Sequence, residues 1–446
     1  MTALLERIST ATRAARPLVC GRVTEVRGLS LTVRGLAVRV GELVTVDGPD
    51  GVELPAEVVA LHGTTIDPLA TCLPLGPLGG VGAGDPVVAT GRPLTVGVGD
   101  ALLGRVLDGL GRPLDGTALP AGLSRVPVEG AAPDALTRDR VSRPLPVGVR
   151  ALDTLVPIGR GQRLGIFAGS GVGKSSLLSM LTRGTQAEVT VLALVGERGR
   201  EVREFLEDDL GPDGLRNAVV VVATSDQPPM VRLRAAFVAT RIAEWFRESG
   251  HDVLLLMDSL TRLAGAQREI GLSAGEPPTT RGYPPSVFAL LPQLLERAGA
   301  SARGSLTGLY TVLVEGDDHN EPVADTARSI LDGHVVLDRR LANAGHFPAI
   351  DVLQSVSRVA GAVTTPEQRS LMREARRLLA ARSDVKELVE IGAYVPGTNP
   401  DADRALATWP ALEAFLQQDL HDLTAADAAW SALAAVLATT RPDGAP

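Results

Sequence analysis

Cysteine is nearly missing from this sequence of 446 residues, which contains only Cys20 and Cys72. Two cysteines are too few for a disulfide framework or a four-cysteine zinc site, so we expect two buried thiols in a reducing cytosol. Long apolar runs are also missing, and none approaches the roughly 20 residues that a membrane-spanning helix needs. Glu6 and Arg7 lie where a secretory signal would be apolar. These absences predict a cytoplasmic protein.

Aromatic residues and excess positive charge are scarce as well. Phe, Trp and Tyr make up 3% of the residues, and 44 Lys and Arg against 52 Asp and Glu give a net charge of −8. Proteins that bind single-stranded nucleic acid need aromatic stacking platforms and a basic surface, so we expect no nucleic-acid partner. Hydrophobic residues at 45% and charged residues at 22% are ordinary for a folded globular chain.

The character of the sequence changes along the chain and predicts four segments. They are an amphipathic docking segment, a β-barrel domain, an α/β domain and a C-terminal helical domain, at residues 1–19, 20–95, 96–365 and 366–446. A helix over 1–17 is too short to be stable alone, so we expect it to dock on a partner; the alternatives are a frayed terminus and a weak contact with a membrane surface. Residues 117–146 are rich in Pro, Gly and Ala without periodicity and are predicted to be a linker.

The barrel and the α/β domain are predicted from two different strand patterns. Short alternating runs between glycines and prolines indicate half-buried strands at 21–26, 29–33, 36–40, 42–46, 56–61 and 85–89. Continuous apolar runs indicate strands of a doubly wound parallel sheet at 164–168, 189–195, 218–223, 253–257, 309–314 and 334–337. Helical spacing is found at 174–183, 230–248, 286–298, 368–381 and 425–438.

A glycine-rich loop joins the first of these parallel strands to a helix. The residues expected to bind phosphate are Ala168, Gly169, Ser170, Gly171, Val172, Gly173, Lys174, Ser175 and Ser176. Glycines let successive N–H groups point at a phosphate, and the helix N-terminus adds its dipole. Lys174 is expected at the β- and γ-phosphates and Ser175 on Mg²⁺. A chance glycine-rich turn is disfavoured by the strand–loop–helix context, so the loop predicts nucleoside triphosphate binding.

Two carboxylates at strand ends are candidates for the chemistry beside this loop. Asp258 ends an apolar strand and is predicted to be a second Mg²⁺-holding group, although it could also cap the next helix. Glu197 ends another strand, where a carboxylate can orient the water that attacks the γ-phosphate. The adjacent Arg198 is expected to hold Glu197 and to meet phosphate oxygens. The alternative for this segment is an ordinary surface loop.

A positive group is also needed for the charge that develops on the γ-phosphoryl oxygens. Arg358, at the end of the segment 355–358, is a candidate arginine finger. An arginine in a short polar turn is more often simply solvated. The residues alone leave open whether Arg358 acts within its own chain or across an interface.

Further motifs follow the phosphate loop in one order. They occupy residues 195–202, 255–262, 275–287, 315–318, 327–334, 344–351 and 355–358, and a further one lies at 104–116. Together they resemble the type III secretion export ATPases, which are relatives of the catalytic subunit of the rotary ATP synthase. Residues 222–229 and 266–270 resemble the flagellar branch more than the virulence branch.

This resemblance implies a β-barrel, a RecA-like nucleotide domain and a helical domain, assembled as a homohexamer with ATP and Mg²⁺ between subunits. It places Lys174, Ser175, Glu197 and Asp258 in the roles given above and Arg358 as an arginine finger donated to a neighbour. Arg198 and Arg262 match phosphate-network arginines. Phe347 replaces the usual Tyr against adenine, and Leu263 replaces a frequent aromatic.

The implied function is ATP hydrolysis that energises flagellar protein export, at the inner membrane through the export apparatus. The implied partners are a stator-like regulator at the N-terminal helix, a central stalk-like protein, the membrane export gate, and export substrates with their chaperones. The alternatives are a virulence-type ATPase and, less favoured, a proton-pumping ATP synthase. A noncatalytic ring subunit would lack Glu197, and an RNA translocase would need aromatics that residues 20–92 lack.

Overall fold

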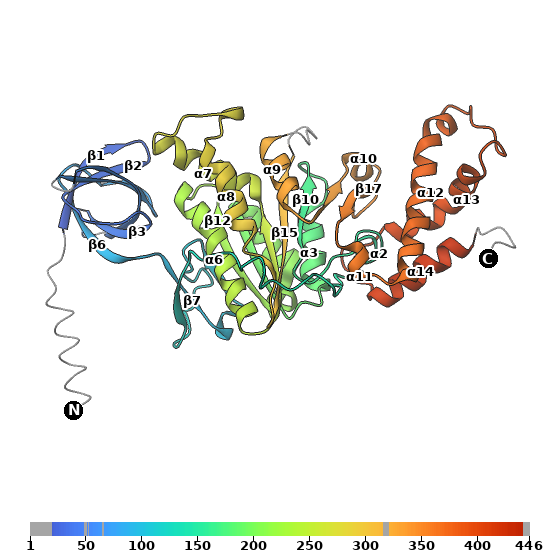
Figure 1. Cartoon of the computed structure of the whole chain (residues 1–446), viewed down its shortest axis with the longest axis horizontal. Helices are drawn as coiled ribbons and strands as arrows, with labels where there is room; N and C mark the ends of the chain where they lie inside the picture. Colours follow the sequence, from blue (N-terminus) through green and yellow to red (C-terminus); the bar gives the residue numbers. More distant parts are fainter. Residues whose placement is uncertain (1–19, 49–50, 52, 65–66, 315–320, 440–446) are drawn as a thin grey trace.

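A computed structural model describes residues 20–48, 51, 53–64, 67–314 and 321–439 of the chain. These residues form three parts along the long axis of the molecule. A β-barrel lies at one end, a sheet flanked by helices lies in the middle, and a group of helices lies at the other end (Figure 1). The predicted helix over 1–17 and the motif at 315–318 lie outside the described residues.

The barrel is closed by six antiparallel strands. In order around the barrel they are β1 (Cys20–Arg27), β2 (Ser30–Arg34), β5 (Pro68–Pro74), β4 (Glu53–Gly63), β3 (Glu42–Asp47) and β6 (Pro86–Pro93). Small apolar side chains such as Val33, Val44 and Val58 fill the interior. Closure leaves no open sheet edge. The predicted β-barrel is confirmed.

Three details of the barrel differ from the sequence predictions. Residues 36–40 are not a strand, because Gly35 has a φ of +78° and turns the chain out of β2, so that Leu36 is buried from a loop. Strand β5 was not expected, since a proline stands at each of its ends. Cys72 is buried as expected, but Cys20 is exposed, because it lies on the outward face of β1.

The middle part is one mixed sheet in which most strands are parallel. Its order is β17 (Ile350–Ser357), β16 (Gly333–Leu337), β10 (Arg163–Ala168), β15 (Ser305–Leu313), β13 (Asp252–Asp258), β11 (Val189–Glu197), β12 (Ala218–Thr224) and β8 (Val106–Asp108). The short β14 (Gly299–Ala300) pairs with β15. The six predicted parallel strands are confirmed. The sequence did not indicate β8 or the antiparallel β17 at the two edges.

Helices cover both faces of this sheet, as a doubly wound fold requires. The longer ones are α3 (Lys174–Gly184), α6 (Pro229–Glu248), α7 (Leu260–Ser273), α8 (Pro285–Leu295) and α9 (Pro322–Ile330). One apolar core includes residues of α6, α7 and α8, and a second includes residues of α3 and the C-terminal helices. The strands between them are buried on both sides, which explains their continuous apolar sequences.

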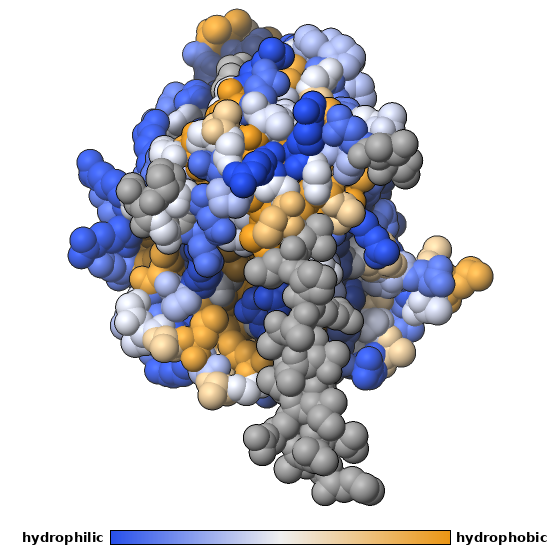
Figure 2. Space-filling view, turned by 90° about the vertical axis from the view of Figure 1, so that its left-hand side faces the viewer, coloured by the Kyte–Doolittle hydropathy of each residue, from blue (hydrophilic) through white to orange (hydrophobic). Residues whose placement is uncertain are grey.

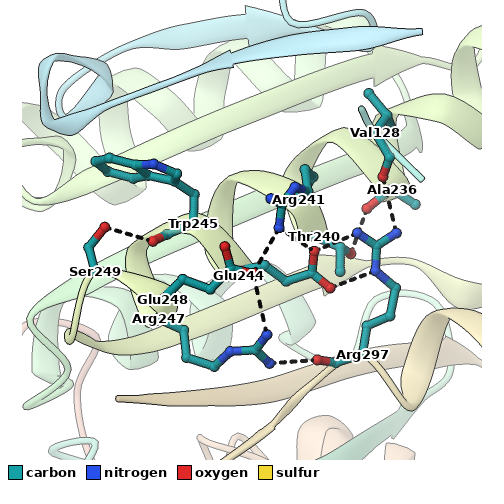
Figure 3. A network of polar contacts seen from close by, with 10 residues as sticks. All are labelled: Val128, Ala236, Thr240, Arg241, Glu244, Trp245, Arg247, Glu248, Ser249 and Arg297. Atoms are coloured by element: carbon teal, nitrogen blue, oxygen red, sulfur yellow. Dashed lines mark hydrogen bonds and ion pairs between the residues drawn. The ribbon is translucent and has the colours of Figure 1, made fainter. Parts of the chain in front are cut away.

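Helix α6 carries two buried ion clusters that fix its neighbours. Arg234 donates to the carboxylate of Glu57 on barrel strand β4. Farther along α6, Glu244 accepts hydrogen bonds of 2.7 and 2.6 Å from Arg297, which lies just after α8 and also donates to the carbonyl of Val128 (Figure 3). One helix therefore links the barrel, the segment that follows it and the end of α8.

The predicted linker at 117–146 is partly ordered structure. Strand β9 (Ser124–Pro127) pairs with β7 (Thr95–Val98), so this segment returns to the start of the middle part. The contact between Arg297 and Val128 follows directly after β9. The high content of Pro, Gly and Ala in residues 117–146 hid the pairing of β9 with β7, because β9 is only four residues long.

The C-terminal part consists of three helices, α12 (Pro366–Glu390), α13 (Pro400–Leu416) and α14 (Ala426–Ala438). Thr365 and Gln368 form a capping box at the start of α12. The predicted helices at 368–381 and 425–438 are confirmed, and α13 is additional. None of the helices in the described part of the chain is both long and apolar enough to cross a membrane.

Shorter elements connect these parts. They are α2 (Arg150–Thr154), α4 (Gly199–Glu204), α5 (Gly211–Leu215), α10 (Arg339–Asn343), α11 (Ala360–Val363), η1 (Asp100–Leu102), η2 (Phe205–Leu210) and η3 (Thr280–Gly282). Seen from the barrel end, apolar patches lie among hydrophilic side chains on the surface (Figure 2). Val40 and Leu61 are exposed apolar residues of the barrel region.

Candidate active site

The phosphate loop lies between β10 and α3, at the carboxyl end of the sheet. Gly171 and Gly173 have φ values of +76° and +86°, which side chains other than glycine rarely adopt. Gly173 is the N-cap of α3, so the loop leads directly to the N-terminus of that helix. Ser175 and Ser176 are exposed in its first turn. The loop has the backbone form that binds a phosphate.

Lys174 lies between the two carboxylates that the sequence singled out. Its Nζ is 2.5 and 2.6 Å from the two oxygens of Asp258 and 3.3 Å from Oε1 of Glu197. Burial lowers the pKa of Lys174, but the attraction of Asp258 and Glu197 outweighs burial and the pKa lies above its ordinary value. The first residue of α3 therefore meets the carboxylates at the ends of β11 and β13.

Lys174 is one of only two lysines in a chain with 44 Lys and Arg; the other is Lys386 on α12. An ammonium group is a compact point charge with three donors, whereas a guanidinium is a flat fork. The phosphate loop therefore has the compact cation in a chain that otherwise uses arginine almost everywhere.

Thr311 on β15 holds Asp258 from the other side, and sequence reasoning missed it. Its hydroxyl donates to Oδ1 of Asp258 at 2.6 Å, and the side chain is fully buried. The parallel register of β13 and β15 pairs Met257 with Tyr310, which brings the next residue of each strand together. A polar residue within an apolar strand was the available signal. Asp258 does not cap α7, because Ser259 is the N-cap.

Glu197 ends β11, and its carbonyl accepts a hydrogen bond of 3.0 Å from the backbone of Ser225. The stem of Arg262 packs beside Gly196, since a Cβ at Gly196 would lie 2.9 Å from Cβ of Arg262. The stem of Arg262 therefore lies beside the residue that precedes Glu197 in β11.

The expectation that Arg198 holds Glu197 is wrong in this structure. Arg198 instead pairs with Glu201 at 3.0 Å, and its side chain is 74% exposed. The physical reason is local: α4 begins at Gly199, so residues 198 and 201 are one helical turn apart.

Phe347 is 43% exposed and lies against the phosphate loop rather than in the core. A Cβ at Gly173 would be 3.2 Å from its ring. The carbonyl of Phe347 accepts a hydrogen bond from the backbone of Gln418, which follows α13. Leu263, by contrast, is fully buried in α7 and belongs to the apolar core, so it has no direct place in this site.

Arg358 lies at the end of the sheet where β16 and β10 begin, opposite the end that carries its own phosphate loop. Strand β17 runs antiparallel to β16, and its last residue, Ser357, pairs with Gly333 at the start of β16. Strand β10, which lies beside β16, has six residues, so at about 3.3 Å per residue the two ends of the sheet are about 20 Å apart. Arg358 is exposed and lies in the turn between β17 and α11, directly after the last residue of the strand. It is therefore accessible and out of reach of Lys174.

Comparison with known proteins identifies two regions of the chain. Residues 148–357 match the ATP synthase alpha/beta family, nucleotide-binding domain. Residues 364–435 match the T3SS EscN ATPase C-terminal domain. The first region contains the phosphate loop, both carboxylates and the end of β17, and the second contains helices α12 and α13.

Whole-chain relatives lead to the same family. A flagellum-specific ATP synthase of Bacillus subtilis is 50% identical over 89% of this chain and 90% of that protein. A type 3 secretion system ATPase of Xanthomonas euvesicatoria is 51% identical over 91% of each. The structure of the assembled ATPase EscN with its central stalk EscO, from enteropathogenic E. coli, matches with a TM-score of 0.86 at 42% identity, covering 94% of this chain and 100% of that chain. This chain therefore belongs to the ATP synthase alpha/beta family and is an ATPase of the group that contains flagellum-specific ATP synthases and type 3 secretion system ATPases.

Proposed function

We propose that this chain hydrolyses ATP with Mg²⁺ and thereby energises protein export through a flagellar type III secretion apparatus. One observation carries the hydrolytic part: Lys174, Asp258 and Glu197 converge beside the glycine-rich loop at the carboxyl end of the sheet. A cation, a metal-binding carboxylate and a second carboxylate are the groups that phosphoryl transfer to water requires. The flagellar assignment is supported by the flagellar relatives and by the motifs at 222–229 and 266–270.

Ser175 and Asp258 would hold the Mg²⁺ ion. Both offer oxygen donors, one on the exposed first turn of α3 and one at the end of β13. Within the described ranges, no group of three or more His, Cys, Asp or Glu side chains could hold a metal ion. This donor set fits Mg²⁺, which keeps several waters and binds substrate phosphates beside one or two protein ligands. When bound, the ion neutralises phosphate charge.

The remaining residues bind the substrate and handle the water. The loop residues Ala168, Gly169, Ser170, Gly171, Val172, Gly173, Lys174, Ser175 and Ser176 bind the phosphates, and the ring of Phe347 stacks on adenine. Glu197 orients the attacking water and accepts its proton. Arg262 contacts phosphate oxygens, and Arg198 joins it after leaving Glu201.

Arg358 completes the site of a neighbouring copy. Its position at the far end of the sheet, about 20 Å from its own phosphate loop, supports donation in trans. We propose a homohexameric ring, as the assembled state of EscN suggests. The subunit is divided into a docking segment at 1–19, a barrel at 20–95, a RecA-like ATPase domain at 96–365 and a helical domain at 366–446.

The tip of the helical domain is the proposed contact for a central stalk-like protein. Leu388, Val389, Ile391 and Val395 lie at the end of α12 and in the loop after it, and all four are exposed, Ile391 by 75%. Exposed apolar residues gathered in one short segment indicate a protein contact. EscN, the structural relative, is known with a central stalk. Residues 1–19 are proposed to bind a stator-like regulator, and the ring to serve the export gate, substrates and chaperones at the inner membrane.

A virulence-type secretion ATPase is the second candidate. The Xanthomonas relative is as similar to this chain as the Bacillus relative, at 51% and 50% identity. The catalytic chemistry is the same in both cases, so the test of hydrolysis applies to either.

The decisive experiment separates binding from hydrolysis and one chain from two. We expect Glu197→Gln to retain ATP binding while kcat falls about 10²- to 10⁴-fold, because the water loses its general base. Radiolabelled ATP retained on the purified protein, together with phosphate release, measures both. Normal hydrolysis by this variant would refute the assignment of Glu197.

Arg358→Ala and Lys174→Ala chains should each be inactive alone and partly active when mixed. In a mixed ring, the intact loop of an Arg358→Ala chain meets the intact arginine of a Lys174→Ala chain. Phosphate release is measured against the mixing ratio. A mixture that remains as inactive as its components would refute the shared site.

A further inference from the structure

Strand β10 connects two functional ends of the molecule. Its carboxyl end, Ala168, leads into the phosphate loop, and its first residue, Arg163, lies at the opposite end of the sheet, where β17 ends. The residues around Arg163 therefore determine how the segment that bears Arg358 is fixed to the sheet.

Asp332 is bound to Arg163 through both main chain and side chain. The Asp332 backbone donates to the carbonyl of Arg163 at 2.8 Å, and Oδ2 of Asp332 accepts from the backbone N–H of Arg163 at 3.1 Å. The side chains also form a bidentate pair, with Nε to Oδ2 and Nη2 to Oδ1 both at 3.1 Å. A bidentate arginine–carboxylate pair fixes orientation as well as distance.

The carbonyl of Asp332 in turn holds the residue of interest. It accepts a hydrogen bond of 3.0 Å from the backbone N–H of Arg358. Gln162, which is fully buried, donates to the same carbonyl and to the hydroxyl of Ser357, each at 3.2 Å. The Ser357 hydroxyl then donates to the carbonyl of Pro157 at 2.7 Å. The side chain of Ser357 and the backbone of Arg358 are thus both fixed by hydrogen bonds.

The approach of the two strands at this point is also close. A Cβ at Gly333 would lie 2.3 Å from the carbonyl oxygen of Val356 and 3.1 Å from Cα of Ser357. Only a glycine allows β16 and β17 to meet there. The side chain of Arg358 is exposed and forms no ion pair with any residue in the described part of the chain. The backbone that carries Arg358 is therefore rigidly fixed, while its guanidinium remains available to a partner.

We propose that Asp332 is a positioning residue for hydrolysis: paired with Arg163, it sets the backbone from which Arg358 reaches the ATP site of the next copy. This inference rests on the proposed function, in which Arg358 acts in trans. Because Arg163 begins the strand that ends at the phosphate loop, β10 connects the ATP site within a subunit to the residue that this subunit contributes to the ATP site of the next copy. Asp332 touches neither ATP nor water and acts through Arg358.

The test uses Asp332→Asn in the full chain. Asn keeps the backbone carbonyl that binds Arg358 and one acceptor oxygen, but it loses the bidentate charged pair. We expect kcat to fall about 10- to 100-fold, as for a displaced catalytic group. KM for ATP should stay near that of the unchanged protein, because the phosphate loop lies at the opposite end of the sheet from Asp332. A rise in KM with unchanged kcat would overturn the proposal.

Complementation in mixed rings gives the readout that a merely structural role would not move. Asp332→Asn chains retain an intact phosphate loop, and Lys174→Ala chains retain a correctly held Arg358. Mixing them should restore activity to the Asp332→Asn sites. If Arg358→Ala is rescued by Lys174→Ala but Asp332→Asn is not, the positioning role is wrong and the shared site stands. If neither is rescued, the proposed function itself fails.

Two further variants keep the test interpretable. Asp115→Asn is the matched control, because Asp115 forms a comparable bidentate pair with Arg105 next to β8, far along the chain from Arg358. It should leave kcat within about 2-fold of the unchanged protein. Should Asp332→Asn fold poorly, Ser357→Ala removes one hydroxyl from the hydrogen bonds that fix the backbone next to Arg358. It should lower kcat about 2- to 5-fold, again with rescue in trans, and an unchanged kcat would count against the proposal.

Discussion

The cluster around Lys174 and the cluster around Glu244 are built from the same kinds of groups, yet they are closed to different degrees. Glu244 and Arg297 are 3% and 1% exposed, and the guanidinium uses its donors on the carboxylate and on Val128 (Figure 3). Lys174 and Glu197 are 17% and 15% exposed. The second oxygen of Glu197 has no hydrogen-bond partner within the described part of the chain.

This difference is the one expected between a structural ion cluster and the proposed reactive cluster. A buried charge that has every hydrogen bond made by protein has nothing left to offer a ligand. A charge whose partners are carboxylates at the mouth of a phosphate loop can exchange those partners for phosphate oxygens. Burial alone therefore does not indicate an active site, whereas incomplete pairing at an accessible strand end does.

The largest expected effect comes from removing the reactive cation. Lys174→Ala should lower ATP hydrolysis by about 10³-fold or more, because an ammonium at the transferring phosphate supplies several kcal/mol of electrostatic stabilisation. Phosphate release measures the effect. Lys386→Ala removes the other lysine, an exposed residue of α12, and should leave the rate unchanged. If Lys174→Ala hydrolysed ATP at the rate of this control, the proposed catalytic role of the Lys174 cluster would be wrong.

Breaking the closed cluster should destabilise the fold instead. Arg297→Met leaves Glu244 buried without its main partner, which costs about 3–5 kcal/mol of unfolding free energy. Arg216→Met removes an exposed pair with Asp213 and should cost less than about 1 kcal/mol. Urea denaturation followed by circular dichroism compares the two. Equal midpoints for both variants would show that the Glu244 cluster contributes nothing to stability.

Asp153 is a third buried acid, and no Lys or Arg in the described part of the chain pairs with it. Its oxygens accept hydrogen bonds from the backbones of Val147 and Gly148, and burial nevertheless raises its pKa to about 7. Since the unfolded carboxyl has a pKa of about 3.9, the folded state holds a proton that the unfolded state releases between about pH 4 and 7. The free energy of unfolding should therefore fall as pH rises through that window, by at most about 4 kcal/mol.

Asp153→Asn should flatten this dependence, because Asn does not titrate. Urea midpoints at several values between about pH 5 and 7 give the slope. Asp213→Asn serves as the control, since Asp213 is exposed and its removal should leave the slope as it is. Parallel slopes for Asp153→Asn and the unchanged protein would contradict the role of burial at this residue.

The parts of the site that follow local pattern could be predicted from the sequence. Glycines at fixed spacing between a strand and a helix identified the phosphate loop, and acids at strand ends identified Glu197 and Asp258. Both features are read along the chain, and parallel strands bring their ends to one edge. The six inner strands of the sheet were predictable for the same reason, because each is a continuous apolar run.

The parts that depend on tertiary pairing could not be predicted. Thr311 touches Asp258 only because β15 lies beside β13 in that register. The reversed direction of β17, which sends Arg358 to the far end, is not encoded in the segment around it. Arg198 had a local signal, since an acid three residues later on a new helix competes for it. The exposure of Cys20 likewise depends on which face of β1 meets the barrel core.

The reversal of the last strand has a consequence for assembly. In the proposed trans arrangement, each copy presents a receiving end of its sheet, with the phosphate loop, and a donating end, with Arg358. Association through unlike surfaces is head-to-tail, and any open row of copies leaves one unfilled receiver at its end. If Arg358 acts in trans as proposed, only closure of the row on itself supplies every receiver with a donor, and the direction of a single strand then makes a cyclic arrangement the state in which every subunit is active.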